Sequence, residues 1–225
     1  PDVIESKSWE SNIFSEILVI NNAWKIRNDW SYCIFPTDFP LNKRPKPSSN
    51  QKLISAEEYV KEQNKFGGFV YAGGTMAFTA AYWSLAKLSP DVLFFLGCDM
   101  IYEGNKTHFY GKGNPDPLRE DISLRSLIAK SARLEAIAST HNCKIFNLSK
   151  KKVSNLIFRK VKIEQVKYKE NFEKRNFKTN KIVKALELEK KLNYFIEDGK
   201  YWKHQKEFEI SKIDKIDKLW KSSIK

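Results

Sequence analysis

Short apolar runs alternate with amphipathic stretches along the first two thirds of the chain. Five apolar runs have the length and the β-branched or aromatic content of buried strands: residues 16–20, 32–35, 69–71, 91–97 and 143–148. Three stretches are predicted to be helices, from a capping pattern or from apolar residues at helical spacing: residues 55–65, 75–88 and 118–141. Strands that alternate with helices predict an α/β fold, with a mostly parallel sheet covered by helices on both faces.

The pattern changes after residue 149. Residues 150–225 are rich in lysine and contain two amphipathic stretches, 182–195 and 210–220. We therefore expect a core domain at residues 1–149 and a basic, mostly helical C-terminal extension at residues 150–225. The extension holds 23 Lys and Arg against 11 Asp and Glu, so it carries nearly all of the net charge of +13.

Composition excludes several classes of protein. The three cysteines, Cys33, Cys98 and Cys143, are scattered in apolar surroundings, which favours reduced core thiols over disulfides. Three histidines without paired Cys/His spacing do not predict a structural zinc site. The longest uncharged stretch, residues 66–86, contains four glycines, which argues against a membrane span. We expect a cytoplasmic protein.

A candidate small-molecule site follows from the order of elements around Asp99. Gly73, Gly74 and Thr75 precede an uncharged helix, and the apolar strand that comes next ends at Asp99. Glycines allow the backbone to approach an anion, and the first amides of a helix favour negative charge. Ligands of open α/β sheets bind outside the carboxyl ends of the strands. A glycine pair alone is also a common tight turn.

Polar side chains follow two other predicted strands. Asn21 and Asn22 come after the run at 16–20, and Asp38 follows the run at 32–35. In a parallel sheet these residues and Asp99 would share one edge.

Residues 73–86 and 92–102 together resemble a superfamily of enzymes with Rossmann-like cores. It includes the bacterial sialyltransferases of glycosyltransferase family 42, the motility accessory factors that modify flagellin, and the archaeal hydroxymethylpterin diphosphokinases. Its members carry a small-residue helix and then an apolar strand that ends in glycine, one further residue and aspartate, with a tyrosine shortly after. Gly97, Asp99 and Tyr102 stand at those places here. The resemblance spans roughly residues 1–150 and implies a Rossmann-like three-layer fold.

The resemblance also implies roles for individual residues. Asn21 or Asn22 would hold the ribose or base of a nucleotide, and Gly74 and Thr75 would lie on its phosphate side. Tyr102 and Tyr110 would stabilise the leaving phosphate, as paired tyrosines do in the sialyltransferases.

The chain departs from the sialyltransferases at the general base. Their histidine precedes the helix after this loop, where residues 114–121 contain none. His108, within the loop, has a side chain suited to deprotonating a sugar hydroxyl, and a structural role in the loop is the alternative. Asp116, Glu120 and Asp121 are further candidate bases, although acids are also common where a helix starts. Lys112 and Arg119 are candidates for neutralising a phosphate or an acidic sugar.

The leading interpretation is a nucleotide-sugar-dependent glycosyltransferase that uses a CMP- or UDP-linked donor and a sugar or glycan acceptor. It requires no metal. The alternative is transfer of diphosphate to a small alcohol, as in the pterin kinases, with a divalent metal bound by Asp38 and Asp99. A third is a non-catalytic nucleotide-binding module. The basic extension predicts peripheral contact with an anionic membrane such as the inner membrane; the alternative is that its charged face is only solvated. Nucleic acid is not an expected partner.

Overall fold

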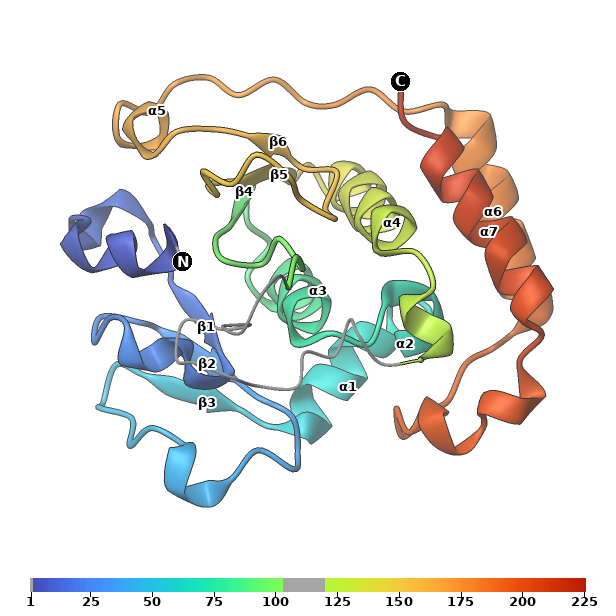
Figure 1. Cartoon of the computed structure of the whole chain (residues 1–225), viewed down its shortest axis with the longest axis horizontal. Helices are drawn as coiled ribbons and strands as arrows, with labels where there is room; N and C mark the ends of the chain where they lie inside the picture. The colour runs from blue at the N-terminus through green and yellow to red at the C-terminus, as the bar shows by residue number, and fades with distance from the viewer. Residues whose placement is uncertain (1, 103–119) are drawn as a thin grey trace.

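The computed structural model describes residues 2–102 and 120–225 of the chain. Its fold is α/β, with two small parallel sheets and helices packed between and around them (Figure 1). The expected α/β class is therefore confirmed. A single continuous sheet was expected, but the strands in the described residues divide into two three-stranded groups.

The first sheet has the order β1-β2-β3, and all its strands are parallel. Its strands are Leu18–Ile20, Tyr32–Ile34 and Lys52–Ile54. Ile34 and Ile54 are fully buried on the face that meets the helices. The opposite face, centred on Cys33 and Trp30, is also buried. Short strands covered on both faces explain why these runs are apolar without strict alternation.

The second sheet has the order β4-β5-β6 and is also parallel. Its strands are Val92–Phe95, Lys144–Asn147 and Arg159–Lys160. The predicted runs at 91–97 and 143–148 correspond to β4 and β5. The sequence pattern gave no indication of β3 or β6, which are only three and two residues long and contain charged residues.

Helix α3, Met76–Lys87, lies between the two sheets (Figure 1). The Thr75 side chain caps it by accepting a hydrogen bond from the amide of Phe78. One face packs Phe78 and Tyr82 against the β4-β5-β6 sheet, and the other packs Trp83 against the β1-β2-β3 sheet. Alanines between these large side chains let the helix approach both sheets closely. Helix α1, Ala56–Asn64, runs beside α3 and starts at the N-cap Ser55, as the sequence predicted.

Two expectations for helices and strands were wrong. Residues 69–71 were expected to form a strand, but Phe69–Ala72 form the short helix α2. A short buried apolar run does not distinguish the two, and two glycines with positive φ immediately before it set the chain direction. The long helix expected at 118–141 begins only at Leu127, after the N-cap Ser126, and continues as α4 to Thr140. A 3-10 helix, η6, Ile122–Leu124, precedes it.

The C-terminal extension packs against α4. It contains α5, Ile163–Lys167, and two longer helices, α6, Thr179–Leu192, and α7, Ile210–Ser222, which lie side by side along α4 (Figure 1). Ile213, Ile216 and Trp220 are completely buried there. Residues of α2, η6 and α4 therefore share one hydrophobic cluster with residues of the extension.

Buried charges accompany this contact. Lys130 of α4 pairs with Asp217 of α7 at 2.9 Å, and Arg133 of α4 pairs with Glu189 of α6 at 2.8 Å. All four side chains are at least nine-tenths buried. Arg133 also donates a hydrogen bond to the hydroxyl of Tyr82. Because buried ions require specific partners, these pairs fix how the extension sits on the core.

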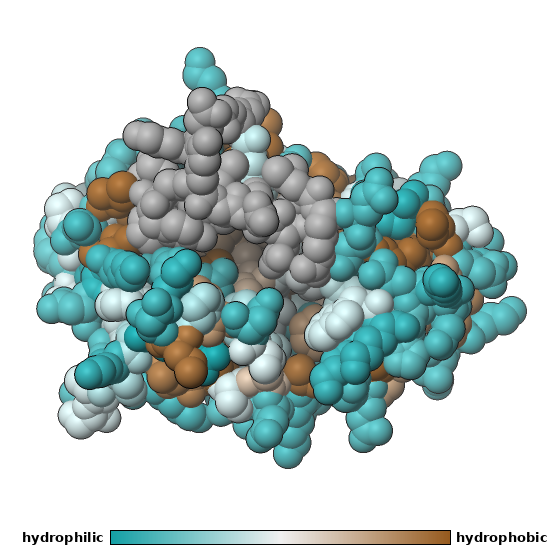
Figure 2. All heavy atoms as spheres, turned by 60° about the horizontal axis from the view of Figure 1, so that its bottom comes forward, coloured by the Kyte–Doolittle hydropathy of each residue, from teal (hydrophilic) through white to brown (hydrophobic). Residues whose placement is uncertain are grey.

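The surface gives two further observations. Within the described residues, no helix is both long enough and apolar enough to cross a membrane. On the face shown in Figure 2, hydrophobic residues form small groups separated by hydrophilic ones.

Candidate functional site

Asp99 lies just beyond the carboxyl end of β4 and is only 2% exposed. The backbone turns sharply there, because Gly97 and Met100 on either side both have positive φ. For Met100 this conformation is uncommon, and such residues cluster at binding sites. One carboxylate oxygen of Asp99 accepts a hydrogen bond from the side-chain amide of Asn147 at 2.9 Å. The other, Oδ2, is buried and has no partner among the described residues.

A chain of hydrogen bonds connects Asp99 to Asp2. Asn147, at the end of β5, accepts from the amide of Ser149, and the Ser149 hydroxyl donates to Asp2 Oδ2 at 2.8 Å. Asp2 begins the 3-10 helix η1, Asp2–Ser8. Its Oδ1 is also buried and unpaired among the described residues. Burial, and after it the carboxylates of Asp99 and Asp2, raise the pKa of the Cys98 thiol to about 12.

Asn21 and Asn22 occupy the corresponding position after β1. They begin the 3-10 helix η3, Asn21–Lys25, and Asn21 has a positive φ of 51°. Asn22 is buried, and the side-chain oxygens of both residues are buried without a partner among the described residues. The carboxyl ends of β1 and β4 therefore share two features, which are a strained backbone and buried acceptors that lack donors.

These four buried acceptor oxygens have no donor among the described residues, which is unusual because nearly all buried polar atoms in proteins are hydrogen-bonded. Such oxygens can accept hydrogen bonds from the hydroxyl or amino groups of a ligand, or can bind a cation. Sugar hydroxyls and base amino groups are donors of this kind. The site is thus suited chemically to a ligand rich in hydroxyl or amino groups, and sequence reasoning had singled out three of its four residues as site residues.

The glycine turn has other partners in this structure. The Gly74 amide donates to the Ser123 hydroxyl at 2.9 Å, and that hydroxyl donates to Asp121 at 2.6 Å. Tyr201, from the extension, also donates to Asp121 and lies over Gly74. A Cβ on Gly74 would stand 2.2 Å from the Tyr201 hydroxyl oxygen. The amide expected on the phosphate side of a nucleotide is therefore bonded to the protein itself.

The remaining predicted residues fall into two groups. Asp38 is exposed after β2, and Tyr102 packs against the core beside β4. His108, Tyr110, Lys112, Asp116 and Arg119 lie outside the described residues. Within residues 2–102 and 120–225, no group of three or more His, Cys, Asp or Glu side chains is arranged to hold a metal ion.

Sequence reasoning missed the residues that complete these contacts. Asn147 lies near the end of the predicted strand at 143–148 and Ser149 follows it, so their position at a strand's carboxyl end could have identified them. No local signal links Ser123 or Tyr201 to the glycine turn, because the contacts span 49 residues for Gly74–Ser123 and 78 for Ser123–Tyr201.

Comparisons of the chain with family models, with curated proteins and with solved structures found no match.

Proposed function

We propose that this protein is a nucleotide-sugar-dependent glycosyltransferase, with the nucleotide bound at the carboxyl ends of β1 and β4. In this proposal the two sheets are the halves of a Rossmann-like three-layer core. The observation that carries it is the set of buried acceptor oxygens on Asp2, Asn21, Asn22 and Asp99 that have no partner among the described residues. Strand ends of this kind are where α/β proteins bind nucleotides.

Each of these residues has a specific task in the proposal. The Asp99 carboxylate accepts hydrogen bonds from ribose hydroxyls, since its Oδ2 is free for that purpose among the described residues. The Asn22 side chain can both donate and accept, which suits the edge of a pyrimidine base. Tyr102 donates to the departing phosphate and so stabilises charge that develops in the transition state. The general base, His108 or Asp116, remains a prediction from the sequence.

Transfer of diphosphate to a small alcohol is the second candidate. The unpaired Asp99 oxygen favours it as well, because a carboxylate oxygen is a ligand that Mg²⁺ prefers. This reaction needs a divalent metal, whereas the sialyltransferase-like reaction does not. Nucleotide binding that is lost completely in excess EDTA would therefore select diphosphate transfer.

A thermal-shift and calorimetry panel of CMP, UMP, NAD and S-adenosylmethionine tests the proposal. A ligand at about 100 times its Kd stabilises the native state by about 2.7 kcal/mol. We expect a pyrimidine nucleotide to give this shift, in the presence of EDTA as well. Tight dinucleotide binding with no response to pyrimidine nucleotides would refute the proposal.

Asp99→Asn sharpens the test. The substitution retains the oxygen that accepts from Asn147 but replaces the unpaired acceptor by an NH₂ donor. We expect nucleotide affinity to fall about 10–100-fold, with little change in melting temperature. Asp38→Asn, at the exposed end of β2, is the matched control and should leave binding unchanged under the glycosyltransferase proposal.

The acceptor is proposed to be a sugar or glycan carried at an anionic membrane and approached by the basic extension. Each suitably placed lysine near such a surface contributes about 1 kcal/mol.

A further inference from the structure

An open pocket of about 710 Å³ lies outside the candidate nucleotide site. Three segments form it: residues 7–11, residues 24–30 before β2, and residues 45–51 before β3. Trp24 and Trp30 belong to the cluster on the face of the β1-β2-β3 sheet that does not pack against α3. The volume is in the range of small-molecule sites.

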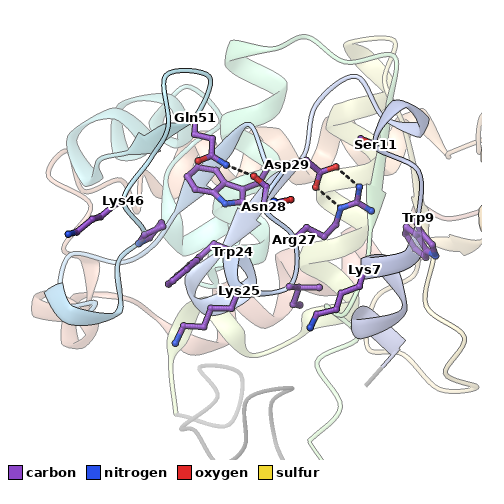
Figure 3. Close-up of a pocket in the computed structure, with 13 residues that line it drawn as sticks. Lys7, Trp9, Ser11, Trp24, Lys25, Arg27, Asn28, Asp29, Lys46 and Gln51 are labelled. Atoms are coloured by element: carbon purple, nitrogen blue, oxygen red, sulfur yellow. Dashed lines mark hydrogen bonds and ion pairs between the residues drawn. The ribbon is translucent and has the colours of Figure 1, made fainter.

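Two tryptophans provide flat apolar walls. Figure 3 shows Trp24 and Trp9 on different sides of the pocket. The Trp24 indole is fixed by a 3.0 Å hydrogen bond to the carbonyl oxygen of Lys43. Trp9 packs against Phe14, with 6.2 Å between ring centres. Rigid indoles lose little conformational freedom on binding, and the C–H faces of sugar rings pack well on them.

The charge in the pocket is positive. Lys7, Lys25 and Lys46 line it, and none has an ion-pair partner among the described residues. The acidic side chain in the lining, Asp29, is paired with Arg27, whose hydrogen bond holds the pKa of Asp29 below its ordinary value. The three lysines therefore have no acid within the pocket to neutralise them.

Nearby acids are also turned away from the pocket. Glu5 and Glu10, which flank Lys7 in the sequence, form ion pairs with Lys150 and Lys167 of the extension. The N-terminal segment thus contributes Lys7 and Trp9 to the pocket while its two glutamates are neutralised elsewhere. This arrangement leaves a local field that attracts anions.

Polar groups in the lining add hydrogen-bonding capacity for a sugar. The Asn28 side-chain amide and the Ser11 hydroxyl make no hydrogen bond with the described residues, so they are available to sugar hydroxyls. Gln51 donates to the Asn28 carbonyl at 2.7 Å and so holds the two loops together. Figure 3 shows Lys7 and Lys25 along one margin of the pocket and Lys46 on another side.

We propose that this pocket binds an anionic carbohydrate, a short glycan that carries carboxylate groups. Indole rings for sugar rings, lysines without an ion-pair partner among the described residues for carboxylates, and an amide and a hydroxyl for sugar hydroxyls occur together there. Lys25 Nζ lies 5.4 Å from the centre of the Trp24 ring, so a sugar ring on that face would also meet this charge. A single-stranded nucleic acid is less well matched, since it requires successive aromatic side chains along a basic groove. The site does not depend on the proposed glycosyltransferase activity, because binding here needs no nucleotide.

Binding of a sialic acid tetramer, measured by calorimetry on the full chain without nucleotide, tests this inference. We expect binding that weakens as salt increases, and at least tenfold weaker binding of the neutral maltotetraose. Trp24→Phe and Lys25→Gln should each weaken tetramer binding severalfold. Trp202→Phe and Lys61→Gln, at exposed positions elsewhere, are the matched controls and should bind as the wild type does.

A second measurement on the wild-type protein does not depend on the folding of variants. In an amide and indole NMR spectrum, the tetramer should shift the indole N–H signals of Trp9 and Trp24 but not those of the fully buried Trp83 and Trp220. Failure of the tetramer to bind at millimolar concentration would overturn the inference, as would equal binding of maltotetraose or equal loss in the control variants. Competition by an eight-residue oligothymidylate that binds more tightly would instead identify a nucleic-acid site.

Discussion

Removing the Asp217 carboxylate should destabilise the protein far more than removing that of Asp214, one turn earlier on α7. Asp217 is buried and accepts a hydrogen bond from Lys130 at 2.9 Å, whereas Asp214 forms an exposed pair with Arg125 at 2.6 Å. Both pairs tie α7 to the segment around α4. Asp217→Ala and Asp214→Ala delete the same atoms from the same helix. The difference between their losses in free energy of unfolding therefore reports the effect of burying the ion pair.

The expected magnitudes follow from the burial of each partner. The Lys130 side chain is 1% exposed, and without Asp217 its ammonium group retains, among the described residues, one acceptor, the Val70 carbonyl oxygen at 3.2 Å. Breaking a buried pair in this way costs about 3–5 kcal/mol. An exposed pair such as Arg125–Asp214 contributes about 0–1 kcal/mol. For a chain of this length, the Asp217→Ala loss corresponds to a fall of about 6–20 °C in melting temperature.

Urea unfolding of both variants, followed by circular dichroism, measures the two losses. Equal losses for Asp217→Ala and Asp214→Ala would refute the reasoning, because they would mean that the Lys130–Asp217 pair is not buried in solution. The double variant Lys130→Met/Asp217→Leu should recover most of the stability, since an apolar pair replaces two ions that must be desolvated.

The same pair predicts a dependence on pH. Burial raises the pKa of the Asp217 carboxyl above its ordinary value, and Lys130 opposes that change. A carboxyl whose pKa is higher in the folded than in the unfolded state binds its proton more tightly in the native protein. Its contribution to the free energy of unfolding therefore falls as the pH rises from the unfolded-state pKa to the folded-state pKa. The deficit of Lys130→Met should therefore be smaller at about pH 4.5 than at pH 7, because Asp217 can then become neutral. An equal deficit at both pH values would contradict this account.

Three further predictions concern other parts of the molecule. Gly74→Ala should lower the free energy of unfolding in urea by about 1–3 kcal/mol, because the new Cβ would overlap the Tyr201 hydroxyl. Adding Tyr201→Phe to the same chain should recover part of that loss. No recovery would mean that another contact is responsible. Burial raises the pKa of the Cys33 and Cys143 thiols to about 12. Iodoacetamide at pH 8 should therefore label both thiols about a thousandfold more slowly in the native protein than in the urea-unfolded protein, as measured by mass spectrometry. Similar labelling rates in the two states would show that the thiols are accessible. Full-length protein should sediment with anionic liposomes at low salt and be released at high salt. Replacing the exposed lysines of α6 by glutamine should weaken liposome binding. No sedimentation at low salt would exclude the membrane contact.

The sequence predicted local structure best where capping and periodicity agree. Ser55 and Thr75 each cap the helix that their patterns indicated, because a side-chain cap is a contact within four residues. The strands that became β4 and β5 were recognisable from continuous apolar runs. Asn21, Asn22 and Asp99 were selected because each follows a predicted strand, and they do lie just after β1 and β4. The shared sheet edge expected for them is not present among the described residues, because β1 and β4 belong to different sheets.

Contacts between distant segments were not predictable in the same way. The helical pattern of residues 118–141 gave no indication that Lys130 and Arg133 are buried and paired with residues of α7 and α6. Their partners lie 87 and 56 residues away, and no periodicity links them. The separation into two sheets could not be predicted from the sequence either, because hydrogen-bonded pairing between strands depends on their arrangement in space.

The position of α3 between the two sheets has a thermodynamic consequence. The strands of both sheets are only two to four residues long, and each sheet buries its inner face against the same helix. Residues Met76–Leu85 are all buried, so α3 cannot leave one sheet without also exposing the surface that supports the other. The two sheets should therefore unfold together, and their most protected amides should exchange with solvent hydrogen at one common free energy.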